Sequence, residues 1–416
     1  MSAISLAEAE GQFVGAIVIG GLKRTNSAVV ERELLIRRGV PLDLLALQKS
    51  VQRLKNLRIF NQVDVELMQD FANGQVTIVF ELQEAWTTIP VFKVNQGGDT
   101  TYVVVGVYDI NTGGNYLEFG AQYESRNGEP GGVAWFRNPR FMNSRVRLGG
   151  DIWSVKRPMD LYTADGTEQG SFVLNRRRAN FFLDRALFDG LTLGLGIEFN
   201  QDSLQEPKLS NGLSSDTITQ LQDGGTSNAV LARTFLRIGH IDYDNYLQSG
   251  AVSELTLAQA TTGLGSDDTF YRVEWDSQAF WRPSHEANIA ARLRLGVTNS
   301  NRLQHLFYVG GFEHVRGFLD GQLRGESYWQ ANLEYRMPGV KWPWVVLQSN
   351  VFFDAAQVNS ESPDAGADSD DIFYSTGVGV RIILPKIYRF IGRFDFAVDT
   401  SHPATSRFSF GVQQFF

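Results

Sequence analysis

The sequence predicts a mainly β protein, in which one small β-α-α-β-β domain precedes a sixteen-stranded antiparallel transmembrane β-barrel. Helical hydrophobic spacing occurs only in the domain expected over residues 13–86 and does not return over 87–416. The longer part instead alternates apolar and polar residues in segments close to the ~9–11 residues that cross a bilayer as a tilted strand. Short and long connections alternate between these segments, which is typical of membrane barrels.

The composition excludes several kinds of functional site and partner. The 416 residues include no cysteine, which excludes disulfides, thiolate metal ligands and cysteine nucleophiles. A net charge of -8 argues against a nucleic-acid footprint. No apolar run is long enough for a spanning helix. The first ten residues lack the basic region and apolar core of an export signal, so we expect a mature or trimmed chain.

The small domain follows an N-terminal extension expected over 1–12. Gly20 and Gly21 end its first strand, and Gly39 is placed to end its first helix after a cap at Thr25, Asn26 or Ser27. An Asn-Gly pair marks the turn of its hairpin. The expected elements are a strand over 13–21, helices over 25–39 and 41–57, and strands over 60–70 and 75–84.

The barrel strands show the alternation directly. Over 191–200, Leu191, Leu195 and Phe199 fall on one face, and Gly194 and Glu198 fall on the other. An antiparallel sheet with one wet face would also alternate. The near-uniform strand length favours the barrel instead. The sixteen strands are expected near 89–96, 100–110, 115–125, 131–139, 144–156, 171–182, 190–201, 228–240, 250–262, 268–282, 286–298, 326–337, 347–358, 371–384, 389–400 and 406–416.

The connections alternate in length along this strand order. Even connections are mostly short, and the odd ones include the long segments 157–170, 202–227, 299–325 and 359–370. Short turns at one end and longer loops at the other are expected of a membrane barrel. An even strand number then puts the small domain on the short-turn side.

The segment "YVGGFEHVRGFLDGQLRG" (308–325) breaks the alternation and contains "VRGF". With the preceding small domain and the strand number, it resembles the superfamily of BamA-like assembly factors, TamA-like proteins and two-partner-secretion transporters, over about 13–416. The small domain resembles one of that superfamily's POTRA domains. Further similar motifs are "FFDAA" (352–356), where Ala356 replaces the usual glycine, "ANLEYRMP" (331–338), "GVGVRIILP" (377–385) and the terminal aromatic Phe416.

The resemblance implies that the loop 299–325 enters the barrel lumen. Arg316 would then need acceptors, and the resemblance places Asp354 and Glu334 on the facing wall, as a latch for the loop. An exposed loop arginine is the alternative. The residues implied for this structural or gating latch are Val315, Arg316, Gly317, Phe318, Glu334, Phe352 and Asp354.

Motifs for catalysis are missing, so we expect no enzyme, no catalytic residue, no cofactor and no metal site. The sequence has neither G-x-S-x-G nor a P-loop, and its five histidines are dispersed. The acidic segment 360–371 lacks the spacing of a calcium loop and is expected to be a solvated loop. On the arginine-rich strand, Arg176 and Arg178 are expected in the lumen and Arg177 outside.

The resemblance implies a bacterial outer-membrane factor that inserts or transports client polypeptides, with its POTRA-like domain in the periplasm. The client would add a strand to a sheet edge near 60–68 or 75–83. The barrel would open between its first and last strands, or conduct the client through its lumen. Expected partners are an extended client and outer-membrane lipids, without nucleic acid. The sequence does not decide whether the protein forms a homodimer. It also leaves the alternative of an anchor or exporter for a fused passenger, such as a patatin-like lipase, ahead of residue 1.

Overall fold

The computed structural model describes residues 2–70, 74–142, 144–188, 190–209, 212–244, 246–361, 371–384, 391–400 and 405–412. These residues form two compact units. Unit 1 comprises 1–90, 107–120 and 135–145, and unit 2 comprises 91–106, 121–134 and 146–416. The longest described helix has 13 residues, and none of the described helices has the length and apolar character needed to cross a lipid bilayer.

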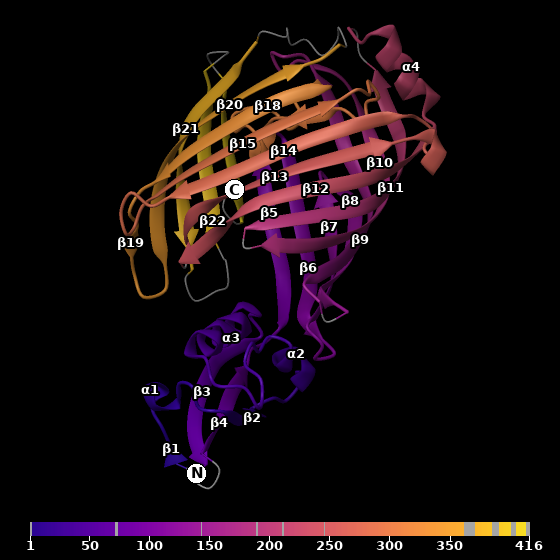
Figure 1. Ribbon diagram of the computed structural model, residues 1–416. Helices are drawn as coiled ribbons and strands as arrows, with labels where there is room; N and C mark the ends of the chain where they lie inside the picture. The colour runs from indigo at the N-terminus through magenta and orange to yellow at the C-terminus, as the bar shows by residue number, and fades with distance from the viewer. Residues whose placement is uncertain are drawn as a thin grey trace. The chain divides into compact units, whose positions relative to one another are not determined.

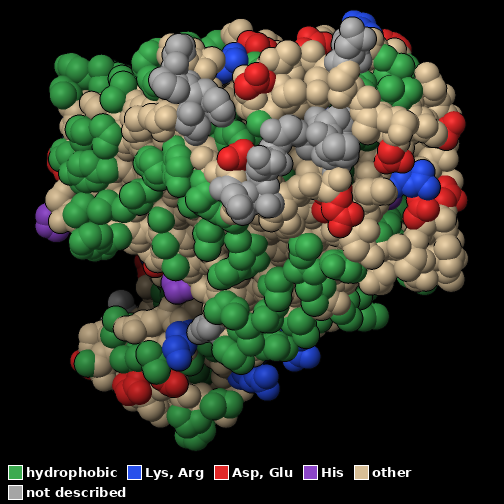
Figure 2. Space-filling model, turned by 90° about the horizontal axis from the view of Figure 1, so that it is seen from above, with side chains coloured by type: hydrophobic (Ala, Val, Ile, Leu, Met, Phe, Trp, Pro, Cys, Tyr) green, Lys and Arg blue, Asp and Glu red, His purple; other side chains and the backbone are tan. Residues whose placement is uncertain are grey.

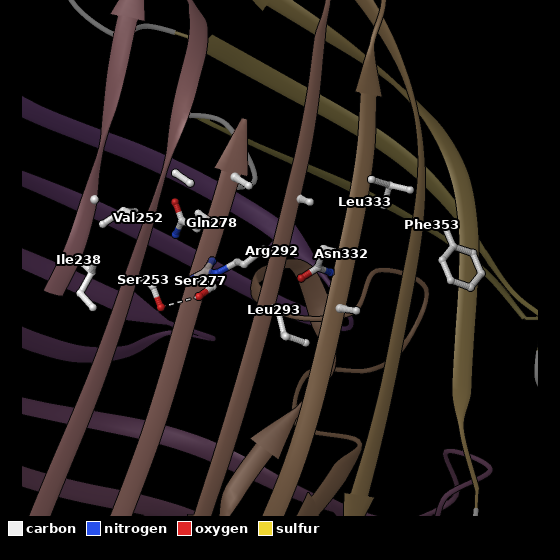
Figure 3. Close-up of a pocket in the computed structure, with 15 residues that line it drawn as sticks. Ile238, Val252, Ser253, Ser277, Gln278, Arg292, Leu293, Asn332, Leu333 and Phe353 are labelled. Atoms are coloured by element: carbon white, nitrogen blue, oxygen red, sulfur yellow. Dashed lines mark hydrogen bonds between the residues drawn. The ribbon is translucent and has the colours of Figure 1, made fainter. Parts of the chain in front are cut away.

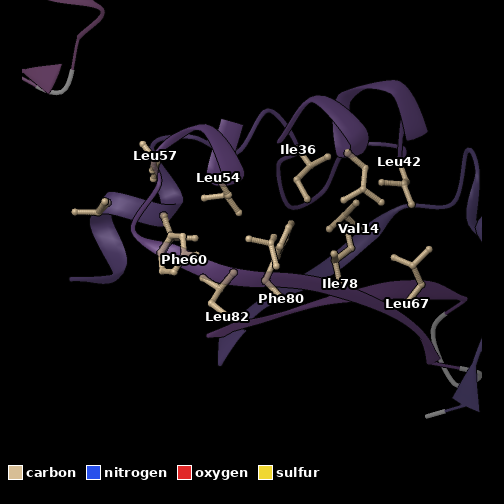
Figure 4. Packing of buried hydrophobic residues seen from close by; sticks show 14 of the residues in the cluster. Val14, Ile36, Leu42, Leu54, Leu57, Phe60, Leu67, Ile78, Phe80 and Leu82 are labelled. Carbon is tan, nitrogen blue, oxygen red and sulfur yellow. The ribbon is translucent and has the colours of Figure 1, made fainter. Parts of the chain in front are cut away.

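The small domain in unit 1 is a four-stranded sheet covered by helices. The strands β1 (Ser2–Ala3), β3 (Phe60–Asp70), β4 (Gln75–Glu84) and β2 (Val14–Gly20) lie in that order. Its hydrophobic core forms between the sheet and the helices (Figure 4). Val30, Leu54 and Ile59 come from the helical side, and Ile78 and Phe80 come from the central strand; all five are fully buried.

The second expected helix is confirmed, and the first is shorter than expected. Helix α3 (Leu44–Asn56) starts after Asp43, whose carboxylate accepts from the Leu45 N–H at 2.8 Å. Helix α2 (Ser27–Glu31) does not continue to Gly39. The chain leaves the helix because the Leu35 N–H donates to Ser50 Oγ of α3 at 2.9 Å and Ile36 turns into the core.

Residues before position 13, expected as an extension, contribute to the domain. Strand β1 pairs with β3, and α1 (Leu6–Ala9) places Ala9 in the core. The sheet order also corrects one expected edge. Strand β4 pairs with β2 on one side and β3 on the other, so 75–83 is an inner strand. On β3, β1 covers only Met68 and Gln69, and 60–66 has no strand on its outer side among the described residues.

A carboxylate holds the segment between β2 and α2. Glu84, the last residue of β4, accepts hydrogen bonds from the backbone N–H groups of Lys23, Arg24 and Thr25 at 2.7–3.2 Å. Burial tends to raise the pKa of the Glu84 carboxyl, but these backbone hydrogen bonds outweigh it and lower the pKa below its ordinary value. Elsewhere in unit 1, Arg140 donates to both carboxylate oxygens of Glu33, at 2.7 and 3.1 Å.

The remaining long strands close into an antiparallel barrel, which confirms the predicted sixteen strands (Figure 1). A two-residue strand, β19 (Val340–Lys341), pairs with β20 beside the end of β18. In chain order the sixteen are β5 (Thr88–Gly97), β6 (Thr100–Thr112), β7 (Leu117–Arg126), β8 (Glu129–Phe141), β9 (Val146–Tyr162), β10 (Glu168–Phe188), β11 (Leu191–Leu209), β12 (Thr226–Asp244), β13 (Leu247–Ala260), β14 (Phe270–Trp281), β15 (Asn288–Thr298), β18 (Ser327–Arg336), β20 (Val346–Asn359), β21 (Phe373–Ile383), β22 (Ile391–Asp399) and β23 (Ser406–Val412).

The barrel wall is apolar outside and charged inside. On β22, Phe394 and Phe396 are exposed on the outer face, and Arg393 and Asp395 are buried on the inner face. Figure 2 shows hydrophobic side chains in broad contiguous patches on the viewed face. This arrangement suits lipid outside and a polar lumen, because unpaired charges are costly against hydrocarbon.

Four neighbouring strands, β9 to β12, are nearly twice as long as the predicted ten residues. Strands β9 to β12 have 17, 21, 19 and 19 residues, so the expected loop over 157–170 is mostly strand. The expected loop over 202–227 contains the end of β11 and a helix, α4 (Ser215–Asp223), seen beside β10 and β11 in Figure 1. An apolar cluster that includes Phe172, Leu221 and Leu306 packs this region. Packing of these apolar side chains outside the membrane-length segment therefore extends the strand pairing of β9 to β12.

The last strand, β23, lies beside the first strand, β5, and closes the barrel at a seam. Among the described residues, β23 and β5 share one paired position, Phe410 opposite Gln96. Asn95 Oδ1 also accepts from the Val412 N–H at 3.1 Å. By comparison, β22 and β23 share seven paired positions, from Gly392 opposite Val412 to Val398 opposite Ser406.

Candidate functional site

The segment between β15 and β18 lies inside the barrel lumen. It contains β16 (Phe307–Val309), a 3-10 turn η2 (Gly311–Glu313) and β17 (Leu323–Gly325), and β16 pairs with β17. Most of 303–325 is buried. Such burial of an irregular segment requires polar partners for its backbone and charges.

Arg316 lies at the centre of this segment and is 1% exposed. Its Nε and Nη2 each donate to Asp354 at 2.8 Å, and its backbone N–H donates to the same carboxylate at 3.1 Å. Nη1 donates to Glu334 Oε2 at 3.1 Å. The guanidinium lies 3.4 Å from the ring centroid of Phe352. The structure thus brings together Arg316, Asp354, Glu334 and Phe352. Arg316 is therefore not a solvated loop arginine.

The charge cluster is larger than the sequence indicated. Arg381 donates to Glu334 at 2.9 Å and to Asp395 at 2.7 Å, and Arg336 donates to Glu334 at 3.1 Å. All these side chains are at most 1% exposed. Each occupies an inward position in its alternating strand, which was a usable signal. Alternation does not show which inward residues meet across the lumen, however, because that depends on register and strand stagger.

An apolar contact supports the other side of the loop. Val315 and Phe318 belong to a buried cluster with Ala356 and Phe373, and the rings of Phe318 and Phe373 meet edge to face at 6.0 Å between centroids. Gly317 has φ of +93°, a conformation that favours glycine. Ala356, which replaces the usual glycine, is fully buried in this cluster.

Three further contacts attach the loop to the end of β9 and to the turns that follow β5 and β9. The Asp320 N–H donates to the Gly98 carbonyl at 2.9 Å. Gln322 Nε2 donates to the Ala164 carbonyl at 2.8 Å, and Arg324 donates to the Tyr162 carbonyl at 2.9 Å. The loop is therefore held against several sides of the lumen wall.

Glycines on β21 make room for the cluster. A Cβ at Gly377 would collide with the Phe396 carbonyl oxygen and with the Phe352 ring that lies under Arg316. A Cβ at Gly379 would meet the side chains of Asp395 and Asn350. These positions explain why the inward face of "GVGV" is without side chains.

The remaining residues and segments singled out in the sequence include the arginine-rich strand, the acidic segment and the terminal aromatic residue. Arg176 donates to Asp202 at 2.7 Å and Arg178 lies 3.3 Å from Glu198, whereas Arg177 is exposed. Phe416 and most of 360–371 lie outside the described residues. Within the described part of the chain, no group of three or more His, Cys, Asp or Glu side chains could hold a metal ion.

A hollow of about 610 Å³ lies at the barrel wall over β13, β14, β15 and β18 (Figure 3). Alanines at 251, 279, 291 and 331 line it. Leu333 and Phe353 lie at one side of it in Figure 3. The Ser277 hydroxyl donates to Ser253 Oγ at 2.7 Å. Leu333 and Phe353 are exposed on the outer face, whereas Asn332, which also lines the hollow, donates to Asp354 of the lumenal cluster at 2.9 Å.

Comparisons with known families agree with this architecture. A family model described as the Omp85 superfamily domain matches residues 111–416. A second, the POTRA model described as the surface antigen variable number repeat, matches residues 12–85. The first match covers the barrel from the end of β6 onward, and the second covers most of the small domain.

Individual relatives are distant in sequence. The chain is 22% identical over 432 residues to the outer membrane protein assembly factor BamA of Nitratidesulfovibrio vulgaris, covering 97% of this chain. It spans about half, 51%, of that relative's length.

Solved structures share the fold. A BamA structure from Haemophilus ducreyi, lacking POTRA domains 1–3, has a TM-score of 0.73 at 18% identity and covers 96% of this chain and 84% of the other. CdiB from Escherichia coli has a TM-score of 0.67 at 12% identity, covering 97% and 76%. CdiB from Acinetobacter baumannii has a TM-score of 0.63 at 15% identity, covering 97% and 74%.

Proposed function

The chain belongs to the Omp85 superfamily, and from this membership we propose that it inserts client polypeptides into the bacterial outer membrane. The POTRA domain captures the client, and the barrel opens at its seam to receive it. The observation that carries the proposal is the seam itself, where Phe410 opposite Gln96 is the one described pair between β23 and β5. Opening the seam frees backbone groups of β5 and β23, and a client strand can then pair with them.

Capture by the POTRA domain uses an open sheet edge. The outer side of β3 over 60–66 faces no other strand among the described residues. An extended client that adds a strand there pairs through its backbone, which does not require a particular client sequence. This suits a factor that handles several clients.

The lumenal loop has a separate role in the proposal. Arg316 joins the loop to β18 through Glu334 and to β20 through Asp354. As a latch, this contact keeps the lumen closed and the wall braced while the seam opens. Transport of the client through the lumen would instead require the loop to leave, which costs the whole charge cluster its pairing.

A disulfide across the seam tests insertion. The chain has no cysteine, so Gln96→Cys with Phe410→Cys introduces a single possible bridge. The matched control is Phe394→Cys with Phe410→Cys, which joins β22 to β23 inside an existing ladder. We expect oxidation to stop client insertion into proteoliposomes for the seam pair alone, with recovery on reduction.

Full activity of the oxidised seam pair would contradict lateral insertion. Passage through the lumen would then be tested by bridging Phe318→Cys to Phe373→Cys, whose native rings lie 6.0 Å apart, with a short bifunctional thiol reagent. Loss of activity there, with an active closed seam, would favour secretion over insertion.

The expected alternative is an anchor or exporter of a fused passenger. It is distinguished by the open reading frame ahead of residue 1: a hydrolase domain supports the anchor, and a signal peptide supports the stand-alone factor.

A further inference from the structure

A second polar feature of the lumen is a cavity of about 420 Å³ beside the seam. Its wall comes from β5, β6, β15, β22 and β23, and from the η2 turn with the His314 that follows it. Liquid water occupies about 30 Å³ per molecule, so the cavity has room for a small ion with part of its hydration shell. All of its lining residues belong to unit 2.

Positive charge dominates the lining of this cavity. Lys93, Arg292, Arg294 and Arg393 face one carboxylate, Glu313. The remaining lining residues are uncharged or neutral in their ordinary state at pH 7, namely Asn95, Tyr102, Phe312, His314 and Val412. A cavity with this lining attracts anions.

Neighbouring carboxylates only partly offset the arginines. Asp276 accepts hydrogen bonds from both Arg292, at 3.0 Å, and Arg294, at 3.4 Å. Arg393 Nε lies 3.5 Å from Asp395, a carboxylate that also accepts from Arg381 at 2.7 Å. Asp276 and Asp395 are thus each shared by at least two arginines, and Arg381 also pairs with Glu334.

Of the four cationic side chains that line the cavity, Lys93 has its charge offset least by acidic side chains among the described residues. Among the described residues, its ammonium has no hydrogen-bond or ion-pair partner, although Glu313 is close enough to act on it electrostatically. Its neighbour Phe92 is exposed on the outer face, so alternation directs Lys93 into the lumen. Water or an anion in the cavity can supply an acceptor to this partly buried ammonium.

We infer that this cavity binds an oxyanion, a phosphate or a carboxylate, between Lys93 and the arginines of β15 and β22. The bound anion joins β5, on one side of the seam, to β22 and the η2 turn. Anion binding therefore stabilises the closed seam together with the lumenal loop. The oxyanion has two possible sources, a free phosphate or a carboxylate of a polypeptide in the lumen.

The test is the heat-modifiability midpoint of the full chain in detergent. Inorganic phosphate and a triglutamate peptide are titrated separately, each against sodium chloride of equal ionic strength. We expect at least one of them to raise the midpoint in a saturable manner. Phosphate acting alone identifies a free anion, and the peptide acting alone identifies a polypeptide carboxylate.

Variants assign the effect to the cavity. Lys93→Gln should weaken the apparent affinity about tenfold, as loss of one charge-assisted hydrogen bond predicts. Lys93→Glu should abolish the effect. The matched control is Lys156→Gln, because Lys156 is 40% exposed, pairs with Glu129 at 3.7 Å and does not line the cavity.

Three results would overturn the inference: no saturable shift with either probe, an equal shift in Lys93→Gln, or an equal loss in Lys156→Gln. The midpoint without added anion shows whether each variant still folds. Because Lys93 makes no described contact that the fold needs, its unliganded midpoint should stay close to that of the parent chain.

Discussion

Arg316 and Asp354 meet through two side-chain hydrogen bonds of 2.8 Å, and the Arg316 backbone N–H adds a third to the same carboxylate. This contact joins residues 38 positions apart and fixes both the loop backbone and its side chain. A planar guanidinium can satisfy two carboxylate oxygens at once, which an ammonium cannot.

Replacement of Arg316 should therefore destabilise the folded barrel strongly. Arg316→Ala leaves Asp354 buried and short of a positive partner, a situation that costs about 3–5 kcal/mol. Arg316→Lys should rescue only part of this loss. The measurement is the shift of the heat-modifiability midpoint in detergent. Arg302→Ala is the control, because Arg302 lies at the start of the same connection with a side chain 47% exposed. Equal shifts at 302 and 316 would remove the latch.

Gly377 should not tolerate a methyl group. A Cβ there collides with the Phe396 carbonyl oxygen and pushes the Phe352 ring, which contacts Arg316. Overpacking of this kind typically costs about 1–3 kcal/mol. Gly392→Ala is the matched control on the neighbouring strand, since its nearest atom would be 3.6 Å away. We expect Gly377→Ala alone to lower the unfolding midpoint, and similar midpoints would contradict this reading.

Glu84 makes the stability of the segment at 23–25 depend on pH. Its pKa is lowered in the folded state, mainly because the Thr25, Arg24 and Lys23 N–H groups donate to it against the opposing effect of burial. A lowered folded pKa stabilises the fold above the ordinary glutamate pKa of about 4.3, and this stabilisation is lost as the pH falls through the folded value.

Hydrogen exchange of these three amides measures the effect. Glu84→Gln should lower their protection at neutral pH by roughly tenfold, and the difference from the parent chain should vanish in acid. Glu66→Gln, at an exposed position of β3, should leave protection unchanged. A Glu84→Gln difference that persists unchanged to pH 2 would contradict the assignment to the carboxylate charge.

Leu221 should hold α4 against the long strands β10 and β11. It is 1% exposed and packs with Leu303 and Leu306. Leu221→Ala removes buried methyl groups, at a cost of about 2–5 kcal/mol for such sites. We expect faster trypsin cleavage after Lys208 in the purified protein. Leu264→Ala, at a 45% exposed position, should cleave at the parent rate.

Periodicity predicted the barrel because every strand has one lipid-facing side, and the same signal held for Leu195 on β11 as for Phe394 on β22. It did not predict where β9 to β12 end, because the apolar cluster around Leu221 is assembled from distant segments. Helix propensity placed α2 correctly but not its end at Glu31, which depends on the tertiary contact of Leu35 with Ser50.

The resemblance named Arg316, Asp354 and Glu334, and the structure brings them together. Arg381 and Asp395 were not predicted to join this cluster, because no local pattern separates them from other inward charges. Their meeting with Glu334 depends on the stagger of β21 and β22 against β18.

The length of β10 and β11 has an immunological consequence. A 21-residue strand rises about 69 Å along its axis at about 3.3 Å per residue, or roughly 49 Å in height at a tilt near 45°. The hydrocarbon layer is about 30 Å thick, so a hydrogen-bonded wall stands outside it. Antibodies raised against the native protein should recognise a conformational epitope there, including Glu206 and Lys208, that a linear peptide of the same sequence does not reproduce.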